Sequence, residues 1–213
     1  MTEVEAGRSG MRDWWLRTLL VLQRPRPVFV ALRDESKEAV SDRSEQVLLI
    51  VMLAGIASVL STRTAGTLMD SSDYDGLLVA VWAFIAGSLY GVFVYFVFGG
   101  LLYLGGRVLG SQGSYRRARH VLAFAAVPLA LSLVVWPVKL ALFGDALFRS
   151  GGSDSGAGGR VFSAIDLAFV AWSVALVVVG VRAVNGWSWP RAAAATALGL
   201  LLPIVLGILY ASR

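Results

Sequence analysis

Five long stretches of apolar residues, separated by shorter polar loops, dominate the pattern of this 213-residue chain. A helix rises about 1.5 Å per residue, so about 20 apolar residues are needed to cross roughly 30 Å of hydrocarbon. The five stretches are close to that length or exceed it. The pattern therefore predicts membrane-spanning helices over Gln46–Thr62, Leu77–Gly106, Val121–Phe143, Val161–Val181 and Arg191–Tyr210.

Proline and glycine positions predict where these helices bend or stop. Pro128 and Pro137 predict kinks in the third span, and Pro203 predicts one in the fifth. The second span is longer than a crossing requires, so we expect it to tilt or to break near Gly99 and Gly100. The loop at residues 144–160 is rich in glycine and serine and predicts a flexible tether without structure of its own.

The residues before the first span predict a separate cytoplasmic segment. Within it, Trp14–Leu22 is mostly apolar, is followed by Pro25 and Pro27, and predicts an amphipathic helix lying in the membrane interface. Asp42, with Glu45 three residues later, predicts a capping box at the start of the first span. We therefore expect two parts, an N-terminal segment over residues 1–45 and a five-helix transmembrane domain over residues 46–213.

Composition supports an all-α integral membrane protein. Hydrophobic residues make up 57% of the chain, charged residues only 15%, and the mean hydropathy is +0.70. The net charge of +5 is distributed beside the apolar stretches, so it indicates membrane orientation and not a nucleic-acid partner. There is no cysteine, which excludes disulfides and thiol chemistry.

Lysine and arginine are divided unevenly between the two sides of the predicted bundle. The N-terminal segment, the second loop and the flanks of the fourth loop carry fourteen of them, and the opposite side carries four. The opposite side is also acidic in its first loop, at Asp70, Asp73 and Asp75. Because basic residues remain on the cytoplasmic side, we predict a multi-pass protein of the cell membrane with a cytoplasmic N-terminus and an extracytoplasmic C-terminus.

Two ionisable side chains stand clearly inside predicted spans. Lys139 lies near the outer end of the third span and Asp166 near the outer start of the fourth. Adjacent spans joined by a loop are expected to be antiparallel neighbours, so both side chains lie at similar depth and could form an ion pair bordering an outward-facing polar site. The alternative is that Lys139 extends to the headgroups and Asp166 reaches water independently.

Small residues recur at a spacing that permits close helix approach. Gly87 and Gly91 form such a pair on the second span. Packing within the chain and dimerisation with a second copy both use this spacing.

The second loop is basic and glycine-rich. Ser114 is placed to cap a short helix that begins at Tyr115. Arginines in and beside this loop could bind lipid phosphates or an acidic partner, or could simply anchor the loop on the cytoplasmic side. These candidates are Arg107, Arg116, Arg117 and Arg119.

The same loop, followed by an apolar helix containing Pro128, resembles the signature of Yip-domain proteins, named for Ypt/Rab GTPase interaction. The stretch from Arg24 to Arg33, the Trp-rich fourth loop and the small-residue helix opening at Arg191 also resemble bacterial members. The resemblance covers about residues 20 to 210 and implies a five-helix membrane domain with a cytoplasmic N-terminus. The Asp-Leu-Tyr-Gly-Pro motif of the eukaryotic branches is missing, so their association with Rab GTPases is not carried over. Some bacterial members are linked to export systems or envelope stress.

No pattern in the chain predicts catalysis. His120 is the only histidine, which excludes His-rich metal sites and the His-Glu-Xaa-Xaa-His motif, and no cofactor or metal is expected. We therefore expect a non-enzymatic scaffold or accessory subunit for a membrane transport, export or envelope system. Its expected partners are membrane lipids, another membrane protein or a second copy of the chain. The alternative is a small transporter or lipid-handling protein with its polar site around Lys139 and Asp166.

Overall fold

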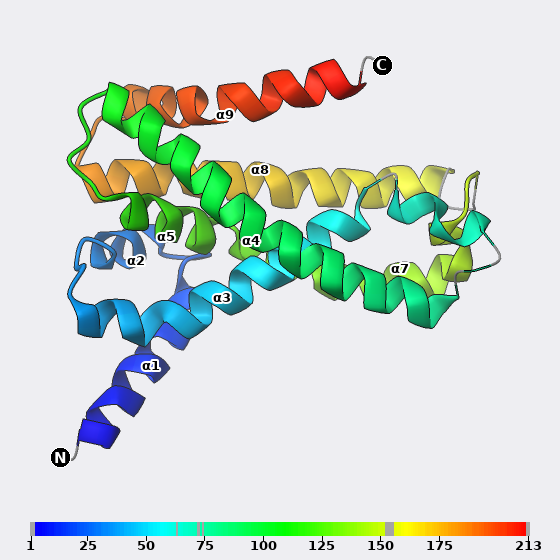
Figure 1. Ribbon diagram of the computed structural model, residues 1–213, viewed down its shortest axis with the longest axis horizontal. Helices are drawn as coiled ribbons and strands as arrows, with labels where there is room; N and C mark the ends of the chain where they lie inside the picture. The colour runs from blue at the N-terminus through cyan, green and yellow to red at the C-terminus, as the bar shows by residue number, and fades with distance from the viewer. Residues whose placement is uncertain (1–2, 63, 72, 74, 152–155, 212–213) are drawn as a thin grey trace. The chain divides into compact units, whose positions relative to one another are not determined.

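The computed structural model describes residues 3–62, 64–71, 73, 75–151 and 156–211, with side chains from residue 12 to residue 201 within these ranges. Every regular element in this part of the chain is helical (Figure 1). The elements are α1 (Glu3–Leu20), α2 (Pro25–Ala31), α3 (Lys37–Leu60), η1 (Ala65–Asp70), α4 (Gly76–Val108), α5 (Tyr115–Ala125), α6 (Val127–Ser132), η2 (Leu133–Val135), α7 (Trp136–Phe143), η3 (Gly144–Phe148), α8 (Ala157–Asn185) and α9 (Trp189–Ala211).

Four helical segments of the described chain are long and apolar enough to cross a membrane. They are Lys37–Leu60, Gly76–Val108, Tyr115–Phe148 and Ala157–Asn185. Helix α9 covers the fifth predicted span, but its side chains after residue 201 lie outside the described part. The count of five spans therefore stays a prediction.

Helix α3 begins earlier than the sequence pattern predicts. It starts at Lys37, and the Ser36 hydroxyl accepts a hydrogen bond from the Ala39 N–H at 3.3 Å, as an N-cap does. The predicted capping box of Asp42 and Glu45 is wrong, because both residues lie inside this helix.

Helix α4 continues without a break through Gly99 and Gly100 (Figure 1). A break at that point is therefore not observed. A Cβ atom added at Gly99 would lie 2.4 Å from Cγ of Arg119. The glycine at this position allows a close approach of α5, and the helix does not end there.

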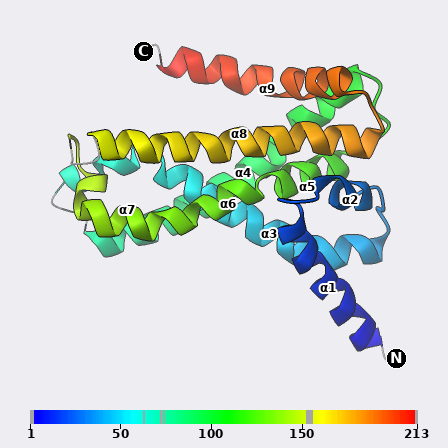
Figure 2. The same cartoon turned by 180° about the vertical axis from the view of Figure 1, so that it is seen from behind.

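The third predicted span consists of several short helices in series (Figure 2). Helix α5 ends at Ala125, just before Pro128, and the 3₁₀ turn η2 separates α6 from α7, just before Pro137. Proline lacks an N–H and its ring clashes with the preceding turn, so each proline interrupts the α-helical ladder on its N-terminal side. The helix is interrupted just before Pro128 and Pro137, where the sequence predicts kinks, whereas α9 continues through Pro203 without a break.

The chain divides into two compact units. Unit 1 comprises Met1–Leu48, Val94–Ala125 and Val174–Arg213, and unit 2 comprises Leu49–Phe93 and Ala126–Ser173. Helices α3, α4 and α8 contribute residues to both units. Each unit is described below by itself.

The core of unit 1 is built around two aromatic side chains. Phe29 and Phe124 are fully buried, and the Trp14 ring packs against Phe124 with centroids 5.4 Å apart. Trp14 is 5% exposed, whereas Leu16 and Leu19 on the same helix α1 are exposed. One face of the predicted interfacial helix therefore packs on protein, and a lipid contact of its other face stays a prediction.

The core of unit 2 joins η1 and η3 to the start of α7. Trp136 stacks on Phe148 with centroids 6.1 Å apart and an interplanar angle of 14°. Arg149 donates to the Met69 carbonyl at 2.8 Å. The prediction of an unstructured loop is therefore wrong for residues 144–150, because Phe148 is a buried anchor that orders the turn around it. It is also wrong for residues 157–160, which form the start of α8 (Ala157–Asn185). Residues 152–155 lie outside the described part.

Apolar side chains cover the outer surface of helix α4. In the most apolar 18-residue stretch of this helix, only 22% is buried within the protein. Phe84, Ile85 and Leu89 are more than half exposed. Such a surface is unfavourable in water and matches the apolar interior of a lipid bilayer.

Candidate functional site

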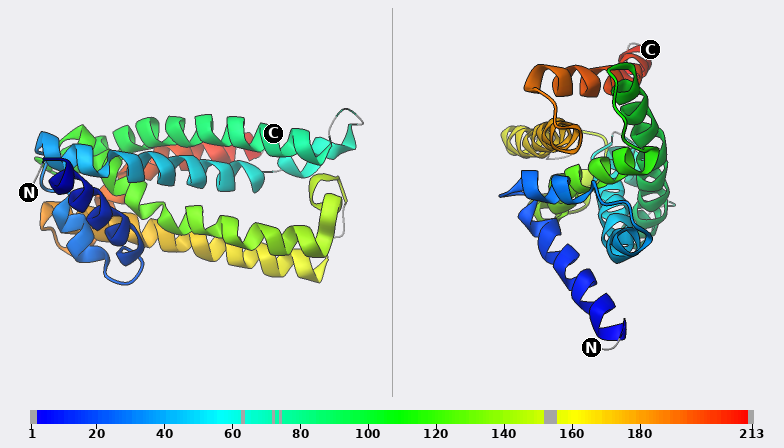
Figure 3. Two further views of the ribbon diagram at one scale, coloured as in Figure 1. Left: turned by 90° about the horizontal axis from the view of Figure 1, so that it is seen from below. Right: turned by 90° about the vertical axis from the view of Figure 1, so that its left-hand side faces the viewer.

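Lys139 and Asp166 form an ion pair in unit 2. Lys139 Nζ lies 2.6 Å from Asp166 Oδ2, which is a hydrogen-bonding distance between charged groups. Helix α7 provides the lysine and the first half of α8 provides the aspartate; the two helices lie side by side (Figure 3). The lysine side chain is 7% exposed and the aspartate side chain 27% exposed. The structure thus brings these two sequence candidates into direct contact.

Two aromatic rings flank the same ammonium group. Lys139 Nζ lies 4.9 Å from the centroid of Trp136 and 5.7 Å from that of Phe162. The negative face of an aromatic ring attracts a cation and offsets part of its lost hydration. The buried charge of Lys139 is therefore stabilised by one carboxylate and two rings.

The pair borders a cavity of about 170 Å³. This volume is more than ten times the roughly 10–15 Å³ that a single water needs on the same measure. Hydroxyl groups of Ser61, Thr62 and Ser163 join Lys139 and Asp166 in its lining, beside apolar side chains. Ser61 and Thr62 donate to the Ala57 and Val59 carbonyls at 3.0 and 2.6 Å. Ser163, by contrast, has no hydrogen-bond partner in the described part of the chain.

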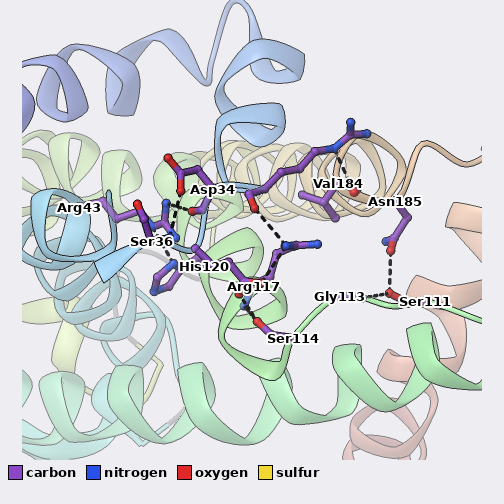
Figure 4. A network of polar contacts seen from close by, with 12 residues as sticks. Asp34, Ser36, Arg43, Ser111, Gly113, Ser114, Arg117, His120, Val184 and Asn185 are labelled. Carbon is purple, nitrogen blue, oxygen red and sulfur yellow. Dashed lines mark hydrogen bonds and ion pairs between the residues drawn. The ribbon is translucent and has the colours of Figure 1, made fainter. Parts of the chain in front are cut away.

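Unit 1 buries an arginine that the sequence analysis counted only as a cytoplasmic charge. Arg43 of α3 is fully buried, and its Nε donates to His120 Nδ1 of α5 at 2.9 Å (Figure 4). A second nitrogen donates to the Asp34 carbonyl at 2.9 Å, and the guanidinium lies 5.5 Å from the Trp14 ring centroid. The signal in the sequence is spacing, because Arg43 stands one and two turns before Val47 and Ile50, which are buried on the same face.

A second group of contacts ties the loop before α3 to α5. Arg117 Nη2 lies 2.8 Å from Glu35 Oε2 and donates to the Arg33 carbonyl at 3.1 Å. The Ser114 hydroxyl also donates to Glu35. Ser114 accepts a hydrogen bond from the Arg117 N–H at 3.1 Å, so the predicted cap of this short helix is confirmed.

Other arginines of unit 1 donate to carbonyl groups at helix ends. Arg33 donates to the Ala183 carbonyl at 2.6 Å and to the Val184 carbonyl at 3.2 Å, in the last turn of α8. Arg191 donates to the Leu109 carbonyl just after α4, with Nε at 3.1 Å. The last carbonyls of a helix have no partner within it, so these guanidinium groups act as C-caps.

The four candidate lipid-contacting arginines have different environments. Arg117 is engaged with Glu35, and the Arg119 guanidinium lies 4.5 Å from the ring centroids of both Phe96 and Tyr115. Arg107 lies 5.7 Å from the Tyr103 ring centroid and is exposed, as is Arg116. Of the four, only Arg107 and Arg116 are thus exposed residues, and Arg107 also donates to the Ser111 carbonyl at 3.4 Å.

The candidate glycines lie where α3 and α4 approach closely within unit 2. A Cβ added at Gly87 would lie 2.5 Å from Ile56 Cα, and one at Gly91 would lie 2.2 Å from the Val51 carbonyl oxygen. Gly55 on α3 faces the same pair, with a Cβ position 2.1 Å from the Gly87 carbonyl oxygen. These contacts are internal to the chain.

Two exposed aspartates outside the spans have shifted titration. Hydrogen bonds from the Ser150 hydroxyl and N–H lower the pKa of Asp70 below its ordinary value of 3.8. The Ser36 N–H similarly lowers the pKa of Asp34. Within the described residues no three His, Asp or Glu side chains gather to hold a metal ion.

The described chain has long apolar helices whose surfaces suit lipid, and several of its charged groups form ion pairs or cap helix ends within a unit. These features define a multi-pass membrane protein. Residues 19–211 match the family model of the Yip1 domain. Because this match covers nearly the whole chain, the protein belongs to the Yip1-domain family, and the resemblance seen in the sequence is confirmed. No match was found among curated proteins or among solved structures.

Proposed function

We propose that this protein is a non-enzymatic scaffold or accessory subunit for a membrane transport, export or envelope system. The observation that carries this proposal is the apolar surface of α4, where large apolar side chains are exposed along most of the helix. Such a face offers contact area to another membrane protein or to lipid. Several charged groups of unit 1, by contrast, hold the unit's own helices together.

The single histidine supports the non-enzymatic assignment. His120 is 5% exposed, and its Nδ1 accepts a hydrogen bond from Arg43. A general acid or base must reach the group whose proton it transfers. His120 is enclosed and already bonded, so it is not placed for such a role.

The orientation that goes with this function is a cytoplasmic N-terminus and an extracytoplasmic C-terminus in the cell membrane. The excess of lysine and arginine in the N-terminal segment and the second loop supports it. A reporter active only outside the cytoplasm, fused after Arg213, should be active, and a reporter active only in the cytoplasm should be silent there. The reverse result contradicts the orientation.

The scaffold proposal is tested by gentle detergent extraction of the tagged protein, followed by mass spectrometry of the proteins that co-purify. We expect a membrane protein at a fixed stoichiometry. Replacing two exposed residues of α4 (Phe84→Ala with Leu89→Ala) should reduce its recovery without changing the melting temperature of the purified chain. The matched control replaces two exposed residues of α8 (Leu167→Ala with Val170→Ala). Absence of any stoichiometric partner contradicts the scaffold role.

One observation favours a second candidate, a lipid-handling protein. The Lys139–Asp166 pair borders a cavity of about 170 Å³. A pair that served packing alone would leave no such space beside it. Bound lipids extracted with the purified protein test this candidate independently of any protein partner.

A further inference from the structure

The cavity beside Lys139 and Asp166 is polar but carries no net charge, because it contains one cation and one anion. A ligand with only negative charge would meet the Asp166 carboxylate, and one with only positive charge would meet the Lys139 ammonium. A ligand that carries both signs a short distance apart satisfies both groups. The charge pattern therefore favours a zwitterion.

Both charged side chains have hydrogen-bonding capacity left after they bind each other. An ammonium has three N–H donors, and Lys139 uses one of them for Asp166 Oδ2. The second carboxylate oxygen of Asp166 accepts no hydrogen bond from the described residues, and Ser163 adds a hydroxyl without a partner in the same part of the chain. The cavity thus offers donors for a phosphate at Lys139 and Ser163 and an acceptor for an amine at Asp166.

Apolar side chains such as Phe143 and Phe162 line part of this cavity, and further apolar residues are exposed on the same two helices. Val138 and Leu142 of α7 are 51% and 65% exposed, and Val161 of α8 is 59% exposed. These residues stand within three positions of Lys139 or within five of Asp166 along the chain. A ligand with a polar head and apolar chains matches this combination better than a wholly soluble one.

We propose that this cavity binds the headgroup of an amine-bearing phospholipid such as phosphatidylethanolamine. The phosphate contacts Lys139 and Ser163, the primary ammonium donates to Asp166, and the acyl chains lie along the exposed apolar residues of α7 and α8. This inference rests on the lipid-handling candidate above and names its ligand. It predicts selectivity against phosphatidylcholine, because a trimethylammonium group has no N–H to donate to a carboxylate.

The test uses the purified full-length chain exchanged into vesicles of equimolar phosphatidylethanolamine, phosphatidylglycerol and phosphatidylcholine with identical acyl chains. Native mass spectrometry then counts the lipids retained. We expect phosphatidylethanolamine to exceed phosphatidylcholine by about tenfold, since a hydrogen bond to a charged group contributes on the order of 1.5 kcal/mol or more. A ratio near one, or a preference for phosphatidylglycerol, overturns the proposal.

Variants show whether this selectivity belongs to the pair. Asp166→Asn should bring the ratio of the two zwitterionic lipids close to one. The apolar double variant Lys139→Met with Asp166→Leu removes both charges without leaving one of them alone, and it should retain neither lipid while keeping the melting temperature of the native chain. Lys37→Met and Asp145→Asn are matched controls at exposed positions and should keep the full preference. Undiminished selectivity in the folded double variant overturns the proposal.

A final arm distinguishes the lipid from its soluble headgroup. Free phosphoethanolamine at millimolar concentration should not raise the melting temperature, whereas the lipid should. An equal effect of both assigns the cavity to a soluble zwitterion and overturns the lipid assignment. All these measurements use purified protein, so failure to find a protein partner leaves their result unaffected, and loss of lipid selectivity leaves the scaffold proposal standing.

Discussion

The two units of this protein use charged side chains in different ways. In unit 1, arginine guanidinium groups donate hydrogen bonds to backbone carbonyls and to His120 or lie over aromatic rings. One of these arginines, Arg43, is fully buried. In unit 2, Lys139 and Asp166 bind each other beside a cavity.

The difference separates charges that hold a fold together from charges that are available to a ligand. Carbonyls at the end of a helix lack partners, and a buried carbonyl without one is costly, so Arg33 and Arg191 of unit 1 are explained by the structure they stabilise. The pair in unit 2 is only partly explained in this way, because the space beside it would be filled in an ordinary core.

The largest effect is expected from Arg43→Ala in unit 1. The substitution removes a charged donor from His120 and from the Asp34 carbonyl, and each buried acceptor left alone costs about 1–3 kcal/mol. We expect the free energy of unfolding to fall by at least about 2 kcal/mol, as measured by denaturant titration in detergent. Arg12→Ala, at an exposed position of α1, is the control. An unchanged transition in the Arg43 variant would show that the buried contacts are not structural.

A smaller but still large effect is expected from Gly91→Ala. The new methyl would lie 2.2 Å from a backbone oxygen, so α3 and α4 must separate locally, and overpacking of this kind costs about 1–3 kcal/mol. Gly76→Ala is the control, because nothing lies within 4 Å of its Cβ position. Melting temperature and oligomeric state are measured together. A change in oligomeric state with no loss of stability would favour dimerisation over internal packing.

An intermediate effect is expected at the ion pair of unit 2. Lys139→Ala leaves the Asp166 carboxylate without its partner, and we expect a loss of about 1–3 kcal/mol, less than for a fully buried pair because Asp166 is 27% exposed. The charge-swapped variant, Lys139→Asp with Asp166→Lys, should recover part of that loss. If the swapped variant is less stable than both single variants, the pair does not contribute to folding.

The smallest effect concerns the contact between η1 and the turn after η3. Because the pKa of Asp70 is lowered in the folded protein, its hydrogen bonds with Ser150 stabilise the fold at pH above 3.8 and are lost as the pH falls through the lowered pKa. Asp70→Asn at pH 7 should therefore speed amide hydrogen exchange at Ser150, with Asp145→Asn as control. Equal exchange in the two variants would contradict this assignment.

Much of the architecture follows from local signals in the sequence. The α-helical ladder is interrupted just before Pro128 and Pro137, because the missing N–H and the ring clash are properties of the residue itself, whereas α9 continues through Pro203. Ser114 caps α5 by a bond to a residue three positions away. Helix α3 starts earlier than the apolar pattern predicts, because that pattern begins only at Gln46 whereas the helix includes the polar residues from Lys37 onward and is capped by Ser36.

The sequence by itself therefore determined the apolar helices, most of their kinks and the family of this protein, since periodicity, length and proline act over a few residues. Only the tertiary structure decided the role of each charge. Arg43 and His120 are 77 positions apart, and Lys139 and Asp166 are 27 apart. Whether such groups meet depends on which helix faces pack together, and that is set by the sum of many long-range contacts. The same physics explains why Arg117 and Arg119, which look alike in a basic loop, are held inside unit 1, while Arg116 directly before them is exposed.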